Sequence, residues 1–168
     1  MVQKVEIVID GKSVELPVLG ASEGLNVIDV RGIIKEGLFT FDPGFLSTAS
    51  CESNVTYIDG DNGILLYRGY AIDQLAEGSS HMEVCYLLLN GELPDKSQLS
   101  EFTKDINDRM SVDEHFQQLF DGFTKNSHPM SMVCAAIAGL ASLQHDSLDI
   151  SDPAYRKEAA LQLIAKIP

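Results

Sequence analysis

Two kinds of hydrophobic periodicity divide the chain. Apolar and polar residues alternate over residues 4–18, which is the pattern of β-strands with one buried face. Asp10 and Gly11 interrupt the alternation, and Asp-Gly supplies the positive φ angles of a tight hairpin turn. A second pair of short apolar runs flanks a polar turn at 59–63. The pattern predicts β-hairpins over 4–18 and 54–67, with a short helix over 30–35 between them.

From residue 72 onward the apolar residues follow helical spacing instead. Gly91 favours the left-handed conformation that ends a helix. We predict helices over 72–76 and 129–143, a last helix from Asp152 onward, and a helix after each of three capping boxes. In a capping box, the side-chain oxygen of the N-cap residue accepts a hydrogen bond from the backbone N–H three residues later. The side chain of that later residue accepts one in return from the backbone N–H of the N-cap residue. The boxes expected are Ser80 with Glu83, Asp95 with Gln98, and Ser111 with Glu114. The predicted fold is therefore mainly α with small N-terminal β-hairpins.

The helix predicted over 129–143 is the most apolar part of the chain. Pro129 suits a first helical position, because its missing N–H would have no partner there, and Ser127 or His128 is then the cap. No charged residue occurs from Met130 to Leu143, and small side chains fill the faces beside the large apolar ones. A helix that is apolar all round is buried on all sides, so we expect other helices to pack against it, some of them from a second subunit. It is too short to span a membrane.

Composition excludes several classes of function. The net charge of -13 argues against nucleic acid and against anionic membrane surfaces as partners, because both require basic patches. The N-terminus lacks the pattern of a signal peptide, and no apolar run reaches about 18 residues. Cys51, Cys85 and Cys134 are too few and too widely spaced for a disulfide framework or a close-spaced zinc site. We expect buried or partly buried thiols in a reducing cytoplasm.

The candidate catalytic and metal-binding patterns are all weak. The histidines are His81, His115, His128 and His145, and none has a second histidine three or four residues away. The turn at 59–63 has oxygen ligands but fails the spacing of a calcium loop. Residues 145–147 read His-Asp-Ser, but adjacent residues point apart, whereas triad members converge from distant positions. From the residues alone we predict no metal site and no catalytic residue.

Several segments of the sequence resemble a known protein family. Residues 40–76, TFDPGFLSTASCESNVTYIDGDNGILLYRGYAIDQLA, closely resemble the N-terminal region of citrate synthase. The resemblance continues through EVCYLLLNGELP at 83–94, SHPM at 127–130 and HDSLD at 145–149. The early hairpin and the phenylalanine-rich loop after it resemble the Gram-negative, hexameric (type II) kind of this family.

The resemblance implies a helical fold and a known reaction. Citrate synthases condense acetyl-CoA with oxaloacetate and water to give citrate and CoA, at the entry to the tricarboxylic acid cycle, without a metal or other cofactor. An aspartate base and two histidines act on the substrates, and arginines hold the carboxylates. These catalytic residues belong to parts of the family sequence that lie beyond Pro168, so none is assigned to this chain.

The resemblance also implies how the chain is organised. Residues 1–48 would form the N-terminal β-hairpin and loop region, and residues 49–168 the N-terminal part of the helical large domain. We expect the chain to be truncated at Pro168 and inactive alone. The resemblance implies a cytoplasmic protein that assembles with itself, as a homodimer and then a hexamer. The helix over 129–143 would lie at the dimer interface.

Hexameric relatives are often inhibited by NADH, and the resemblance places parts of that allosteric site here. Arg109, Met110 and Lys166 are the positions that match. Gln144 stands where regulated relatives carry an aromatic residue, and Gln162 where they carry a basic one, so we expect weak or absent inhibition. Two other functions stay open. The chain could be a truncated paralogue that regulates a full-length subunit, or its parent could be a 2-methylcitrate synthase.

Overall fold

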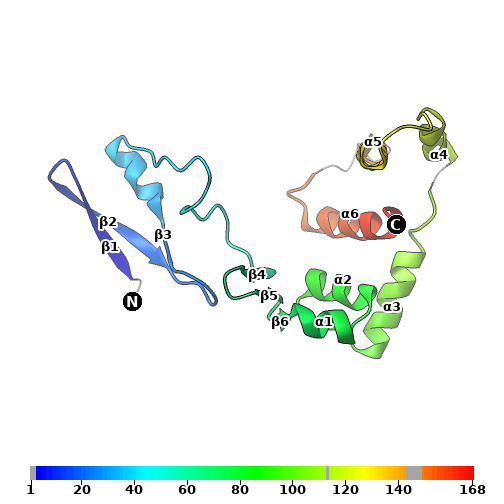
Figure 1. The fold of residues 1–168 in the computed structure, drawn as a ribbon, viewed down its shortest axis with the longest axis horizontal. Helices are drawn as coiled ribbons and strands as arrows, with labels where there is room; N and C mark the ends of the chain where they lie inside the picture. Colours follow the sequence, from blue (N-terminus) through cyan, green and yellow to red (C-terminus); the bar gives the residue numbers. More distant parts are fainter. Residues whose placement is uncertain (1–2, 113, 143–148) are drawn as a thin grey trace. The chain divides into compact units, whose positions relative to one another are not determined.

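The computed structural model describes residues 3–112, 114–142 and 149–168. About 45% of it is helical, with small antiparallel sheets, which confirms the mainly α prediction (Figure 1). The chain forms two compact units, Met1–Ser79 and Ser80–Pro168. In the described residues, the first holds the sheets, a short 3-10 helix and one α-helix, and the second holds helices. The predicted boundary after residue 48 concerns domains of the parent protein and stays a prediction.

The first sheet is the predicted hairpin with one short strand added. β1 (Lys4–Ile9) pairs antiparallel with β2 (Lys12–Leu19), and β2 pairs with β3 (Val27–Ile28). The turn residues Asp10 and Gly11 both have positive φ angles, of 51° and 78°, as the Asp-Gly pattern predicts. The short helix is also confirmed. It is a 3-10 helix, η1 (Val30–Glu36), which ends at a left-handed Gly37.

The second sheet follows the second predicted hairpin. β4 (Thr56–Asp59) pairs with β5 (Ile64–Tyr67), and β6 (Tyr70–Ala71) leads into α1 (Ile72–Gly78). At the turn, the carboxylate of Asp59 accepts hydrogen bonds from Asn62, at 3.1 Å from its backbone N and 2.8 Å from Nδ2. The polar residues that suggested a calcium loop therefore stabilise the turn itself.

In its described residues the second unit contains five helices. They are α2 (His81–Asn90), α3 (Lys96–Asn107), α4 (Glu114–Asp121), α5 (Pro129–Ser142) and α6 (Pro153–Lys166). Its core lies where α2, α3 and α6 meet. Phe102 and Ile106 of α3 pack with Leu161 and Ala165 of α6, and the ring of Tyr86 meets Phe102 edge-on at 5.4 Å. Burial of these side chains fixes α6 against α3.

Two of the three predicted capping boxes form. Ser80 with Glu83 begins α2, and Asp95 with Gln98 begins α3. The third box stays a prediction: α4 begins at Glu114, and the residue before it lies outside the described part of the chain. The helix predicted over 129–143 forms with nearly the expected bounds, and the backbone N of Met130 donates to Nδ1 of His128.

The prediction that this helix is buried on all sides is wrong for the chain by itself. No residue of α5 is buried, and the side chains of Met130 and Ile137 are 62% and 38% exposed. The physical reason is that, in the described residues, α4 and the end of α6 cover only part of the surface of this apolar helix. The expectation of buried or partly buried thiols holds only for Cys85, since Cys51 and Cys134 are exposed.

Candidate functional site

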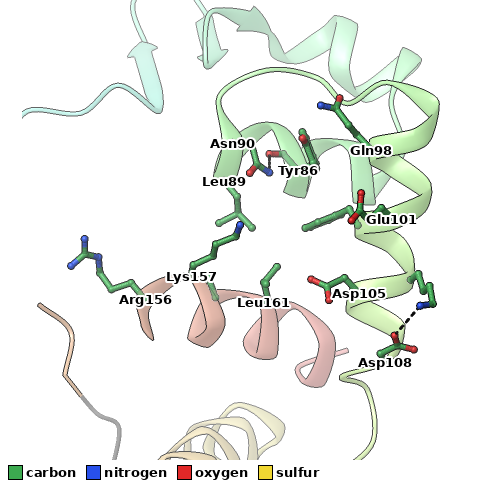
Figure 2. A pocket seen from close by; sticks show the side chains of 13 residues that line it. Tyr86, Leu89, Asn90, Gln98, Glu101, Asp105, Asp108, Arg156, Lys157 and Leu161 are labelled. Carbon is green, nitrogen blue, oxygen red and sulfur yellow. Dashed lines mark hydrogen bonds and ion pairs between the residues drawn. The ribbon is translucent and has the colours of Figure 1, made fainter. Parts of the chain in front are cut away.

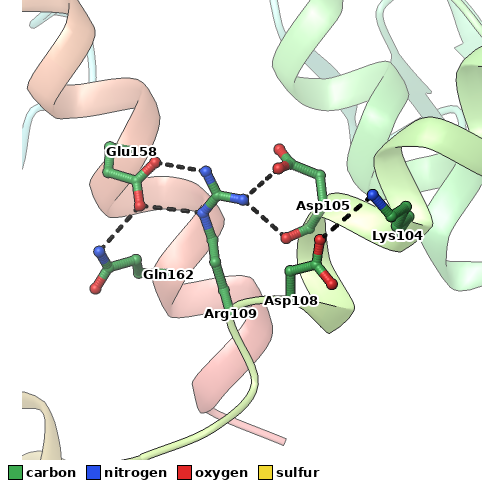
Figure 3. Close-up of polar contacts among 6 residues, drawn as sticks. All are labelled: Lys104, Asp105, Asp108, Arg109, Glu158 and Gln162. Carbon is green, nitrogen blue, oxygen red and sulfur yellow. Dashed lines mark hydrogen bonds and ion pairs between the residues drawn. The ribbon is translucent and has the colours of Figure 1, made fainter.

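The site suggested by the sequence lies where the end of α3 meets α6. Asp152 caps α6 by accepting a hydrogen bond from the backbone N of Ala154 at 2.9 Å, and Pro153 begins the helix. The core contacts of α3 and α6 align the polar edges of the two helices. Arg109 lies two residues after the end of α3, and its side chain reaches the edge of α6 (Figure 3).

Arg109 is held by two carboxylates. Its Nε and Nη2 donate to the two carboxylate oxygens of Glu158, at 3.0 and 2.8 Å. Its Nη1 donates to the backbone carbonyl of Asp105 at 2.8 Å and to the carboxylate of the same residue. The pair with Glu158 is the bidentate arrangement in which a guanidinium binds a carboxylate best. We call Arg109, Asp105, Glu158, Gln162 and Lys166 the Arg109 cluster.

The contacts of the cluster change its titration. The hydrogen bond from Arg109, followed by the one that Gln162 Nε2 donates at 3.0 Å, lowers the pKa of Glu158 below its usual value. The same contacts with Glu158 and Asp105 raise the pKa of Arg109, which stays charged at any ordinary pH. The side chains of Arg109 and Glu158 are 25% and 44% exposed, so solvent screens their attraction in part.

Lys166 of α6 also binds the link between α3 and α4. Its Nζ donates to the backbone carbonyls of Arg109 and Ser111, at 2.6 and 2.7 Å. The link between α3 and α4 is therefore tied to α6 at two places, by Glu158 and by Lys166, which lie about two helical turns apart. Met110 lies in this link with its side chain exposed.

The structure thus brings together two of the three residues predicted for nucleotide binding. Their cationic groups, however, face acceptors within the chain. Sequence reasoning missed both carboxylates. Asp105 stands four residues before Arg109, a spacing that indicates a helical ion pair, and this signal was available. Glu158 lies 49 residues from Arg109, and no local pattern reveals such a contact.

A groove of about 670 Å³ lies beside the cluster, between α2, α3 and α6 (Figure 2). Tyr86, Phe102 and Leu161 contribute its apolar surface. The rim carries carboxylates on α3 and the basic side chains of Arg156 and Lys157 on α6. Charges of both signs line the groove, so it does not present the concentrated field of one sign that would select an ion.

A second groove, of about 290 Å³, is mainly apolar. It lies between α4, α5 and the end of α6, and we call it the apolar groove. Its lining side chains include Phe116, Phe120, Met132, Val133, Ile137 and Ile167. It adjoins the exposed apolar side chains of α5, among them Met130 and Ile137.

The histidines do not form a catalytic constellation in the described part of the chain. His128 caps α5 through Nδ1, as expected of a capping residue. The side chain of His115 and all of residues 143–148, which include Gln144 and the His-Asp-Ser run at 145–147, lie outside the described residues. His81 is exposed in the first turn of α2. In the described ranges, no helix is long and apolar enough to cross a membrane.

Comparison with known proteins agrees with the resemblance in the sequence. A family model described as "Citrate synthase, C-terminal domain" matches residues 44–168. Similar solved structures include citrate synthase from Pyrobaculum aerophilum, at 25% identity and a TM-score of 0.61, covering 98% of this chain and 38% of that one. Citrate synthase from Thermotoga maritima MSB8 matches at 26% identity and a TM-score of 0.60, covering 76% and 32%.

A third similar structure shares the fold at lower identity. It is the citrate synthase of the archaeon Thermoplasma acidophilum in a ternary complex with carboxymethyl coenzyme A and oxalateacetate, at 23% identity and a TM-score of 0.64. The match covers 71% of this chain and 31% of that chain. The chain therefore spans about a third of the length of the structures that it matches.

These findings confirm the predicted fold and the family. The family model is described by a C-terminal domain, whereas we expect the N-terminal part of the parent. The position of the chain in its parent and the hexameric kind both stay predictions. The match covers well over half of the chain, and the fold agrees along it. The chain belongs to the citrate synthase family.

Proposed function

We propose that this chain is the N-terminal part of a citrate synthase, which condenses acetyl-CoA with oxaloacetate and water to citrate and CoA. The observation that carries the proposal is the family match over residues 44–168. The chain covers about a third of the solved relatives, which leaves room for catalytic residues in polypeptide beyond these 168 residues. In this proposal the described helices are scaffold, and the reacting groups come from elsewhere in the parent.

An assay of citrate synthase activity tests whether the reacting groups lie outside this chain. The 168-residue chain should release no CoA thiol from acetyl-CoA in the presence of oxaloacetate, whereas the full-length parent should turn over under the same conditions. Turnover by the chain near that of the parent would overturn the proposal. Replacing acetyl-CoA with propionyl-CoA in the parent assay separates citrate synthase from 2-methylcitrate synthase, because the two differ in the acyl group they accept.

We also propose that α5 forms the interface of a homodimer, within a hexamer of the Gram-negative kind in the cytoplasm. The support is the uncharged surface of α5, where Met130 and Ile137 are exposed, and its continuity with the apolar groove. A second copy presenting the same helix would cover both surfaces through small side chains that allow close approach.

Light scattering tests this interface. The chain should be a dimer or larger at high concentration, and Ile137→Glu should shift it toward monomer by placing a charge in the buried contact. Val8→Glu is a matched control, because Val8 is an exposed apolar residue of β1 and does not belong to α5 or the apolar groove. A wild-type chain that stays monomeric at high concentration would contradict the proposal.

For NADH we propose weak or absent inhibition of the parent. The support is that Arg109 and Lys166, the cations expected to meet phosphate, donate to Glu158, Asp105 and backbone carbonyls. A phosphate would have to displace these acceptors and lie beside a carboxylate. Calorimetric titration of the parent with NADH should give little heat, and tight binding would refute the proposal.

A second candidate function is a regulatory module: a truncated paralogue that pairs with a full-length subunit. The uncovered α5 supports it as well as it supports the parent dimer. Co-expression with a tagged full-length subunit tests it, because a module should co-purify in a defined ratio and change that subunit's activity. A reading frame that continues past Pro168 would exclude it.

A further inference from the structure

The first turn of α2 places an imidazole in contact with a thiol. His81 and Cys85 are four residues apart, so they lie on the same face of the helix. Nε2 of His81 is 3.4 Å from Sγ of Cys85. His81 is exposed, whereas Cys85 is half-buried at the edge of the core. A search for pairs of histidines at helical spacing does not find this mixed pair.

The distance between the two atoms matches the geometry of a tetrahedral metal site. Zinc binds thiolate at about 2.3 Å and imidazole at about 2.0–2.1 Å, and at the tetrahedral angle these bonds separate sulfur from nitrogen by about 3.5 Å. The separation in the structure is 3.4 Å. The two donor atoms therefore already stand at about the separation that one shared ion requires.

The donor types decide which ion fits. Thiolate and imidazole bind zinc and softer cations, whereas magnesium and calcium prefer oxygen ligands. Over the described ranges, no group of three or more His, Cys, Asp or Glu side chains could hold a metal together. The pair thus offers two ligands, and the exposed position of His81 lets water occupy the others.

We propose that His81 and Cys85 form a two-ligand site for a zinc-class divalent cation, with water completing the tetrahedron. On binding, the S–H bond of Cys85 breaks, a metal–sulfur bond forms, and the proton leaves to solvent. The imidazole of His81 supplies the lone pair of Nε2, and nothing is oxidised or reduced. Burial raises the pKa of the Cys85 thiol.

Cadmium titration of the 168-residue chain tests the site, because cadmium–thiolate bonds absorb in the ultraviolet. Cys51→Ser and Cys134→Ser are combined first, since both thiols are exposed and would bind the probe. In this background one cadmium ion should bind per chain with a charge-transfer band, and Cys85→Ser should abolish the band.

His81→Gln decides whether the imidazole is a ligand. It should weaken cadmium binding by at least about tenfold, the lower end of what losing a supporting partner costs a metal site. His128→Gln is the matched control and should leave the affinity unchanged, because His128 lies at the start of α5. Equal affinity of His81→Gln and its parent, or no band before Cys85 is changed, would overturn the site. Circular dichroism verifies that each variant keeps its helices.

Discussion

The bidentate contact of Arg109 with Glu158 should stabilise the second unit measurably. Glu158→Gln keeps the size of the side chain and removes its charge, and Arg109→Met removes the guanidinium. Exposed ion pairs contribute about 0.2–1 kcal/mol, and a bidentate pair in a network lies at the upper end of that range. Because solvent reaches both side chains, we expect a coupling free energy of about 1 kcal/mol.

A double-mutant cycle measures this coupling. Urea unfolding of the chain, the two single variants and the double variant gives the interaction free energy without the other effects of each substitution. Lys104 and Asp108 serve as the matched control, because they form an i,i+4 pair with side chains 81% and 65% exposed and 3.8 Å between charged atoms. Their cycle should give about 0.3 kcal/mol.

The pH dependence gives a second test with a definite sign. Contact with Arg109 lowers the pKa of Glu158 in the folded chain below the ordinary value of a glutamate side chain. The coupling is therefore fully present above that value and is lost as the pH falls through the lower pKa of the folded state. A coupling at neutral pH no larger than that of the control pair, or one unchanged in acid, would refute the role given to Glu158.

Three further substitutions test the packing and the helix ends through the free energy of unfolding in urea. Gly32→Ala would place a methyl carbon 2.9 Å from Cδ2 of Leu16 and should lower the free energy of unfolding by about 1–3 kcal/mol. Gly60→Ala is the control, because its methyl carbon would meet nothing within 4 Å, and its cost should be far smaller. Equal losses of stability in the Gly32→Ala and Gly60→Ala variants would contradict this prediction and show that η1 shifts to make room for the methyl group. Asp95→Ala removes the cap of α3 and should cost about 1 kcal/mol, and no loss would mean that the box contributes nothing. Leu87→Ala empties a fully buried position of α2 and should cost about 2–5 kcal/mol; a loss under 1 kcal/mol would contradict its place in the core.

The sequence by itself determined the local structure, because the causes of that structure lie within a few residues. Asp10 and Gly11 adopt the turn that their types favour, and the box at Ser80 forms from residues three apart. Gly91 ends α2 in a left-handed conformation. The family could also be identified from the sequence, because segments such as residues 40–76 are long enough to be specific. The family match includes most of that segment.

Only the tertiary structure decided which charges meet and which surfaces stay open. Arg109 and Glu158 are 49 residues apart, and their contact exists because packing of Phe102 and Ile106 against α6 brings the helix edges together. The composition of α5 predicted burial, but burial depends on what surrounds a helix, and this chain leaves it uncovered. Local spacing fixes turns and caps, whereas long-range contacts depend on how the helices pack.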